Sequence, residues 1–271
     1  MIARRLAALL ALIAVGLCAL AAGARPLEDC KPLYSDVGLP VHFAKADGAP
    51  PTLLCRQGYL LAHNNDTRIS DWVLEALTAE QIEGGATRKK STFKSDPDLP
   101  AEHRATLGDY KGSGYDRGHQ APAADFKSGQ PMMDESFYLS NMAPQVGVGF
   151  NRGVWRQLEE YVRDLLPTRE RLIVITGPVY QAPEINVPAD KTIGANRVAV
   201  PAAFYKIVYH PRSERALSFL LPNRRLKGRQ PREFRISVDA IEELTEIDFL
   251  AALPRRRQRQ LESRVVPMWQ H

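Results

Sequence analysis

The spacing of apolar residues changes near residue 166 from a helical repeat to a continuous run, and this change constrains the fold of the chain more than any other feature. Between residues 149 and 166 apolar side chains recur at helical spacing, while charged side chains take the opposite face. Pro167 ends this segment, and a β-branched run over residues 171–178 follows and closes on Gly-Pro. An amphipathic helix next to a buried strand predicts an α+β domain. The apolar positions of the helix are Val154, Trp155, Leu158, Val162 and Leu165.

Other segments repeat these patterns. Residues 53–62 and 72–79 flank a polar turn at 63–66, which predicts a strand followed by a second strand or a short helix. Residues 202–209 and 216–221 form a plausible hairpin around a polar turn. The polar stretch 84–114 predicts loops. Ser237 can cap a helix over the residues that follow it.

The first 24 residues have the composition of an export signal. Arg4 and Arg5 precede an apolar stretch from Leu6 to Ala21, and small residues at 22–24 provide a cleavage site. We therefore expect residues 1–24 to be removed and the protein to be periplasmic or secreted, without stable membrane association afterwards. A retained anchor is the alternative, because the apolar run approaches the ~20 residues that a spanning helix needs.

Two cysteines, Cys30 and Cys55, remain after the signal. In an oxidising compartment an even pair predicts a disulfide. Two buried thiols are the alternative. A bridge closing a loop of about 25 residues would contribute roughly 3–4 kcal/mol and would tie the amino-terminal arm to the first strand.

The mature chain has only a small positive excess. The 36 Lys and Arg residues fall to 34 when Arg4 and Arg5 are removed, against 31 Asp and Glu. This excess is compatible with a polyanionic partner but is too small to identify one. Neither a linker nor a repeat divides residues 25–271, so we expect one domain with a short basic tail at Arg255–Arg257.

The stretch Asp116-Arg117-Gly118-His119 carries the most functional information. A histidine alone is usually structural, but here a cation lies two residues before it and a glycine between them tolerates unusual backbone angles. Phosphodiester hydrolysis needs a base of near-neutral pKa, a cation for the developing charge and a metal at the leaving oxygen. The stretch could hold the imidazole of His119 beside a phosphate bound by Arg117.

Further motifs surround this stretch. They are His103–Thr106, Asp109–Tyr110, Gly112–His119, Phe137–Gln145, Asn151, Trp155, Leu158–Glu159, Thr176–Pro178, Val200–Pro201, Leu221–Asn223 and Ile241–Glu242. Together they resemble the DNA/RNA non-specific endonucleases of the ββα-metal type over roughly residues 55–254, and the Asp-Arg-Gly-His and Ser-Asn-x-x-Pro-Gln pair is the most specific. The resemblance implies one domain with a central, mainly antiparallel sheet, and an enzyme that cuts DNA and RNA and leaves 5′-phosphate ends.

The resemblance also implies a metal site. His119 would be the general base, Asn151 the sole direct protein ligand of a hydrated Mg²⁺, and Glu159 the acid that holds metal-bound water. Mn²⁺ or another divalent ion could take the same place. Asn151, Trp155 and Glu159 are spaced i, i+4 and i+8, so on a helix both polar ends can face one cleft. One amide ligand suits magnesium, which keeps its waters.

The remaining roles concern the substrate. By the same resemblance Arg117 and Asn141 would bind or orient it, with Asp116 and Gln145 beside them. A further transition-state arginine is expected before Phe93. We choose Arg88 for this role, although Lys89, Lys90 and Lys94 offer other cations there.

Each assignment has a structural alternative. Asn151 could cap a helix, Glu159 could be a solvated helical residue, and Asn141 could serve the backbone conformation. Trp155 is expected in the core rather than against the substrate. For the whole chain the alternative is a non-catalytic, exported nucleic-acid-binding protein on the same scaffold. The family's glycine after Thr245 is replaced by Glu246, which puts the local loop shape in doubt.

Overall fold

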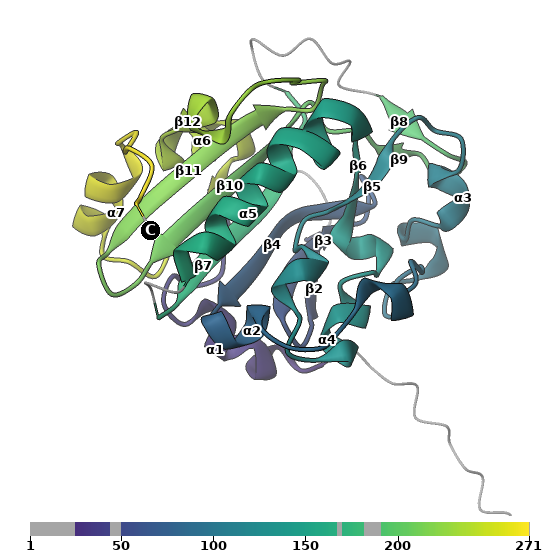
Figure 1. Ribbon diagram of the computed structural model, residues 1–271, viewed down its shortest axis with the longest axis horizontal. Coiled ribbons are helices and arrows are strands. Elements are labelled where there is room, and N and C mark those ends of the chain that lie inside the picture. Colours follow the sequence, from purple (N-terminus) through teal and green to yellow (C-terminus); the bar gives the residue numbers. More distant parts are fainter. Residues whose placement is uncertain (1–24, 44–49, 167–169, 182–190, 271) are drawn as a thin grey trace, which may run out of the picture.

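The computed structural model describes residues 25–43, 50–166, 170–181 and 191–270 (Figure 1). The predicted signal at residues 1–24 and the predicted helix end at Pro167 lie outside these ranges. A seven-stranded sheet in the order β12-β11-β10-β7-β4-β3-β2 forms the centre, and all its strand pairs are antiparallel. The expected α+β fold with an antiparallel sheet is confirmed. Its strands are β2 (Thr52–Cys55), β3 (Tyr59–Asn64), β4 (Ile69–Leu77), β7 (Leu172–Val179), β10 (Ala203–His210), β11 (Arg215–Pro222) and β12 (Arg235–Ile236).

Strand β10 shows how the sheet divides the core. Phe204 and Val208 face the layer that contains α5 (Arg156–Leu165). Tyr205 and Ile207 belong to a second core on the opposite face, beneath the amino-terminal arm and α6 (Val238–Thr245). The alternation follows from the two-residue period of a strand. Both faces of the sheet are therefore covered, and α5 lies across one of them (Figure 1).

The hairpin of β10 and β11 and the Ser237 cap of α6 agree with the sequence patterns, since the Ser237 hydroxyl accepts from the backbone N–H of Ala240. The segment 53–62 differs, because it divides into β2 and β3, and β3 continues through the expected turn to Asn64. Residues 72–79 lie mostly in β4.

Short helices and strand pairs complete the described part of the chain, and none of its helices has the length and apolar character to cross a bilayer. The basic run 255–257 begins a helix. The short helices are Leu27–Cys30, α1 (Lys31–Tyr34), α2 (Ala79–Ile82), Arg88–Lys90, Ala101–His103, α3 (Leu107–Tyr110), Ala123–Asp125, α4 (Gln130–Glu135), Leu139–Asn141, Pro231–Phe234 and α7 (Arg255–Glu262). The short strands are β1 (Val41–His42), β5 (Asp116–His119), β6 (Met142–Gln145), β8 (Thr192–Ile193), β9 (Val198–Ala199) and β13 (Ile247–Asp248).

The prediction of one continuous helix from residue 149 is wrong in its first half. Gly147–Trp155 is an irregular helical segment, in which Gly149 has φ +85° and Gly153 has φ −128° and ψ −113°. Regular helix begins only at Arg156. Trp155 is fully buried, as expected of a core residue. The apolar spacing thus predicts which face packs on the sheet, but it does not predict the break that glycine permits.

Cys30 and Cys55 form the predicted disulfide, with their Cα atoms 5.7 Å apart. Arg25 also pairs with Cys55 as an isolated β-bridge. The amino-terminal arm is therefore joined to β2, as the sequence predicts.

Reduction of this bridge should destabilise the protein. Opening the Cys30–Cys55 bridge removes a constraint on the unfolded chain that is worth roughly 3–4 kcal/mol. Mild reduction should release two thiols per mature chain and lower the thermal midpoint, which thiol titration and calorimetry measure. Two free thiols in the protein before reduction would contradict the prediction.

Glu246 ends α6 in a left-handed conformation, with φ 58° and ψ 30°. A side chain in this region costs about 1–2 kcal/mol, and the greater entropy that glycine loses on folding offsets roughly 0.5–1 kcal/mol. Glu246→Gly should therefore raise the free energy of unfolding by up to about 1.5 kcal/mol. Exposed Glu243 lies inside the same helix, so Glu243→Gly should lower it by about 1 kcal/mol. Urea unfolding measures both, and equal losses would contradict the argument.

Candidate active site

Two short strands and the segment that follows them form the frame of the site. β5 and β6 pair antiparallel, with His119 opposite Met142 at one end. The irregular segment Gly147–Trp155 and then α5 follow β6 directly, which is the strand–strand–helix order of the expected ββα motif. In Figure 1, β5 and β6 lie beside the start of this helical segment.

Gly118 is required for space rather than for an unusual backbone angle. Its φ is not positive, contrary to the expectation. A Cβ at this position would lie 2.1 Å from the side chain of Gln145, which is fully buried against the strand. Any larger residue would therefore require the buried side chain of Gln145 to move.

A pocket of about 840 Å³ opens beside this frame. Of the four cations on either side of Phe93, Arg88 lines the pocket, and Lys89, Lys90 and Lys94 do not. The structure thus brings most of the sequence-predicted site residues together. Those that line the pocket are Arg88, Asp116, Arg117, His119, Asn151 and Glu159.

Two phenylalanines hold His119 and its neighbouring cations. The imidazole packs edge-on against Phe137, with ring centroids 5.0 Å apart, and lies 5.6 Å from Phe93. The guanidinium of Arg117 lies 4.4 Å from the centre of the Phe93 ring, and that of Arg88 lies 5.7 Å from the Phe137 ring. Burial, with a smaller contribution from the charge of Arg88, lowers the pKa of His119 to about 3. The imidazole is therefore neutral at physiological pH, although this pKa is lower than the near-neutral value expected of the base.

Asn151 is oriented by hydrogen bonding. Its Nδ2 donates to Oδ2 of Asp116 at 2.9 Å, while Arg152 binds the same carboxylate through Nε at 2.8 Å and Nη2 at 2.9 Å. The Oδ1 atom of Asn151 has no partner in the described part of the chain, so it is available to a cation. Asn151 does not cap α5, because the residue before that helix is Trp155.

Glu159 lines the pocket and lies near the buried cation Lys206. Burial raises the pKa of Glu159 to about 7, while nearby Lys206 acts in the opposite direction. Lys206 projects from β10, is 1% exposed and donates to Oγ1 of Thr176 at 2.5 Å. Its Nζ lies 5.1 Å from the centre of the Trp155 ring.

Asn141 and Gln145 do not line the pocket, and both side chains are fully buried. Asn141 is fully buried and bonded to backbone: its Nδ2 donates to the carbonyls of Ala121 and Ser136, and its Oδ1 accepts from the N–H of Ala121. It fixes the chain just after His119. Gln145 is buried against Gly118. Their residue types suggested polar contact with substrate, but both lie beneath the strands.

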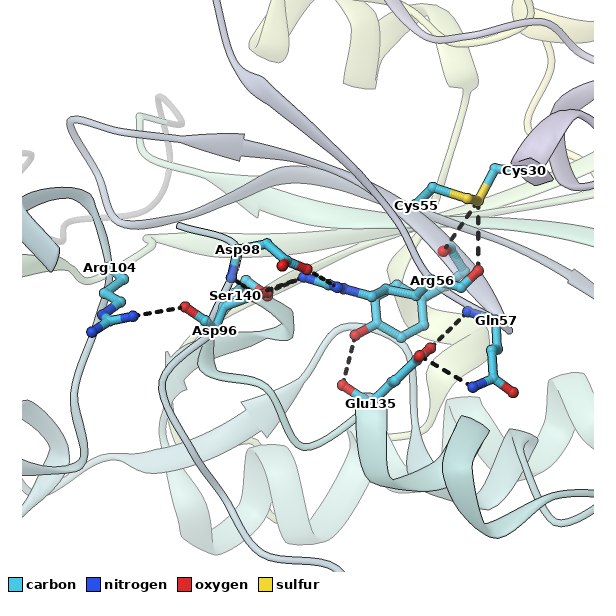
Figure 2. Close-up of polar contacts among 10 residues, drawn as sticks. Cys30, Cys55, Arg56, Gln57, Asp96, Asp98, Arg104, Glu135 and Ser140 are labelled. Carbon is cyan, nitrogen blue, oxygen red and sulfur yellow. Dashed lines mark hydrogen bonds and ion pairs between the residues drawn. A yellow bond between two sulfur atoms is a disulfide. The ribbon is translucent and has the colours of Figure 1, made fainter. Parts of the chain in front are cut away.

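A buried network of ion pairs and hydrogen bonds joins the residues after β2 to the residues before Asn141 (Figure 2). Nη2 of Arg56 donates to both carboxylate oxygens of Asp96 at 2.6 Å, and its Nη1 donates to Asp98 at 2.5 Å. The Ser140 hydroxyl donates to Asp96 as well. Removing one partner of a buried ion pair is strongly destabilising. The network therefore ties β2, through Arg56, to the residue before Asn141.

Sequence reasoning missed several residues of the site. Phe93 and Phe137 were noted only as landmarks or as part of a motif, and Lys206 lies within an ordinary apolar strand pattern. Arg56 and Asp96 are forty residues apart, so no local pattern joins them. Further cations line the pocket, and a count of Lys and Arg in the 84–114 and 149–166 segments could have suggested some of them. They are Lys111, Arg152, Arg156 and Arg163.

Comparisons with known proteins agree with this geometry. The family model of the DNA/RNA non-specific endonucleases matches residues 43–256. Nuclease C1 of Cunninghamella echinulata var. echinulata is 38% identical over 216 residues, which cover 76% of this chain and 85% of the relative. Human mitochondrial endonuclease G is 35% identical over 206 residues, covering 73% and 69%. A crystal structure of the EndoG/EndoGI complex matches with a TM-score of 0.76 and 33% identity, covering 84% of this chain and 94% of that one. The chain therefore belongs to the DNA/RNA non-specific endonuclease family and is a metal-dependent DNA/RNA endonuclease.

Proposed function

We propose that the mature protein hydrolyses DNA and RNA phosphodiester bonds with His119 as general base and one hydrated Mg²⁺ held by Asn151, leaving 5′-phosphate ends. The observation that carries the proposal is the convergence of His119, Asn151 and Glu159 on one pocket with several cations. A neutral imidazole can take a proton from water, and guanidinium groups favour the charge that develops on phosphate.

Each side chain has a distinct task in this scheme. His119, neutral and held by the two phenylalanines, accepts the proton of the attacking water. Arg117 and Arg88 bind the phosphate, and their contacts with the faces of Phe93 and Phe137 limit their motion. Asp116 lines the pocket and orients Asn151 and Arg152, which both donate to its carboxylate oxygens.

The donor set fits a hydrated, oxygen-preferring ion. Asn151 Oδ1 would bind it directly, and the Glu159 carboxylate would hold its waters. When bound, such an ion would polarise the phosphate and stabilise the leaving oxygen. Mn²⁺ could occupy the same oxygen site. The described residues place no cluster of three His, Cys or acidic ligands in this pocket, which distinguishes it from a zinc cage.

Cleavage of supercoiled plasmid and of structured RNA by residues 25–271 tests the proposal. With Mg²⁺ both substrates should be degraded, and chelator should abolish the reaction. A kinase should label the product 5′ ends only after phosphatase treatment. Tight binding of either substrate without cleavage would instead support the non-catalytic alternative and overturn the proposal.

The pH dependence of cleavage should follow Glu159 rather than His119. With a pKa of about 3 the imidazole remains neutral from pH 5 to 9, whereas the Glu159 carboxyl is protonated below its pKa of about 7 and then lacks the negative charge that favours metal-bound water. Activity should therefore fall as the pH falls through about 7, and saturating metal should move this midpoint lower. Glu159→Gln should be less active and should lack this step. A step of unchanged midpoint in Glu159→Gln would contradict the assignment.

We also propose export to the periplasm or the medium. The proposal rests on the signal-like composition of residues 1–24 and on the Cys30–Cys55 disulfide, a bond typical of oxidising compartments. Expression of the full chain in a bacterial host, followed by fractionation and mass spectrometry, should find protein that begins at Arg25 outside the cytoplasm. Intact protein confined to the cytoplasm would overturn this part of the proposal.

A further inference from the structure

The loop after β11 is strongly basic. Residues 223–232 contain five cations among ten residues and no acid, although the mature chain has an excess of only three positive charges. All five are exposed. Solubility does not require such a concentration of one sign, so a polyanion is the partner that this surface fits. The cations are Arg224, Arg225, Lys227, Arg229 and Arg232.

The loop is anchored rather than loosely tethered. Asn223 is 5% exposed, accepts from the Val146 N–H at 2.9 Å and donates to the carbonyls of Pro144 and Pro201 at 3.0 and 2.9 Å. Leu226 is 7% exposed and packs into the core shared with α5. The cations therefore project from an anchored backbone, so little backbone entropy is lost when they bind a ligand.

This loop lies against the segment that carries Asn151. A Cβ on Gly149 would lie 3.0 Å from Cγ of Arg225 and 3.3 Å from the backbone N of Lys227. From the same segment Arg152 lines the active-site pocket. The Gly147–Trp155 segment thus contacts both the pocket and the basic loop, although its one cation, Arg152, is paired with Asp116.

Four of the five loop cations form no ion pair within the described residues, although Arg232 is next in sequence to the acidic Glu233. Arg229 forms an ion pair with Glu233 at 2.6 Å, whereas no acidic side chain pairs with Arg224, Arg225 or Lys227 in those ranges. Double-stranded DNA carries about one negative charge per 1.7 Å of its axis. A duplex held at the pocket therefore extends well beyond it and presents further phosphates to neighbouring cations.

We propose that Arg224, Arg225 and Lys227 bind backbone phosphates several nucleotides from the scissile bond. The inference rests on the proposed function, because the duplex must lie in the pocket. The three residues act on affinity for long polymers and take no part in the chemical step. The protein then favours long nucleic acid over short fragments, without any preference for sequence.

The triple variant Arg224→Gln, Arg225→Gln, Lys227→Gln tests this surface. Exposed Arg256 and Arg259 on α7 provide a matched control as Arg256→Gln, Arg259→Gln. On long duplex DNA the triple variant should show a KM raised about tenfold or more at 0.15 M salt, with kcat unchanged. The slope of log Kd against log salt, measured by anisotropy on a labelled duplex, should become shallower by up to about three.

A small substrate separates this surface from the catalytic site. On a p-nitrophenyl phosphodiester of thymidine, kcat and KM of the triple variant should equal those of the wild type, and the control should match the wild type throughout. An unchanged salt slope on long DNA, or equal losses on both substrates, would overturn the inference. The wild type could instead bind DNA without cutting it, while the triple variant shows a shallower slope of log Kd against log salt. That result would support this surface and overturn the proposed activity.

Discussion

His119→Ala should lower kcat by roughly 10²- to 10⁴-fold or more and leave duplex binding nearly unchanged. The loss follows from the environment of the imidazole, because no other neutral nitrogen base lines the pocket in the described ranges. The guanidinium groups of Arg88 and Arg117 have no acceptor atom and cannot act as the base, and Glu159 is assigned to hold water. Single-turnover cleavage with saturating Mg²⁺ measures the chemical step directly.

His103→Ala is the matched control, since His103 does not line the pocket. It should retain wild-type turnover. His119→Ala removes an edge-on contact with Phe137, so its thermal midpoint should fall by only a few degrees. Near wild-type turnover in His119→Ala would refute the assignment, and so would a loss that is fully accounted for by unfolding.

Local motifs predicted the polar residues of this site because each motif occupies one element. Asp116–His119 forms β5, and Asn151 and Glu159 lie on the segment that directly follows β6, so short stretches of chain set their positions. The central sheet was predictable for a similar reason, since β7, β10 and β11 are mainly apolar runs bounded by turn residues.

The supporting residues could not be predicted in this way because they depend on long-range packing. Asn141 and Gln145 have the polarity of substrate contacts, and only the fold shows that they are buried. Lys206 occupies a position in β10 where the strand period requires an inward-facing side chain, yet an apolar pattern gives no reason for a cation there. The break at Gly153 was missed because side-chain periodicity does not report on backbone angles.

Substitution of Asn151 should affect catalysis almost as strongly as loss of His119. Asn151→Ala removes the single neutral oxygen ligand assigned to the ion and should lose most activity. Glu159→Gln should be impaired less, because an amide can still orient a water. Cleavage measured as a function of Mg²⁺ concentration should show Asn151→Ala requiring far more metal, together with a thermal midpoint close to that of the wild type.

Asn151→Asp distinguishes metal binding from a role in local structure. A carboxylate would attract the ion, but it would repel the phosphate and reduce the ion's capacity to accept charge, so only part of the activity should return. It would also lie against Asp116, which accepts from Asn151 Nδ2 at 2.9 Å, and the two negative charges should lower stability. A helix cap would tolerate the same change, since aspartate caps as well as asparagine. Full activity in Asn151→Asp, combined with an Asn151→Ala that loses stability but keeps its rate, would therefore refute the metal assignment. The metal assignment predicts the opposite pattern. Asn151→Ala should be stable but inactive, and Asn151→Asp should bind the ion tightly but react slowly.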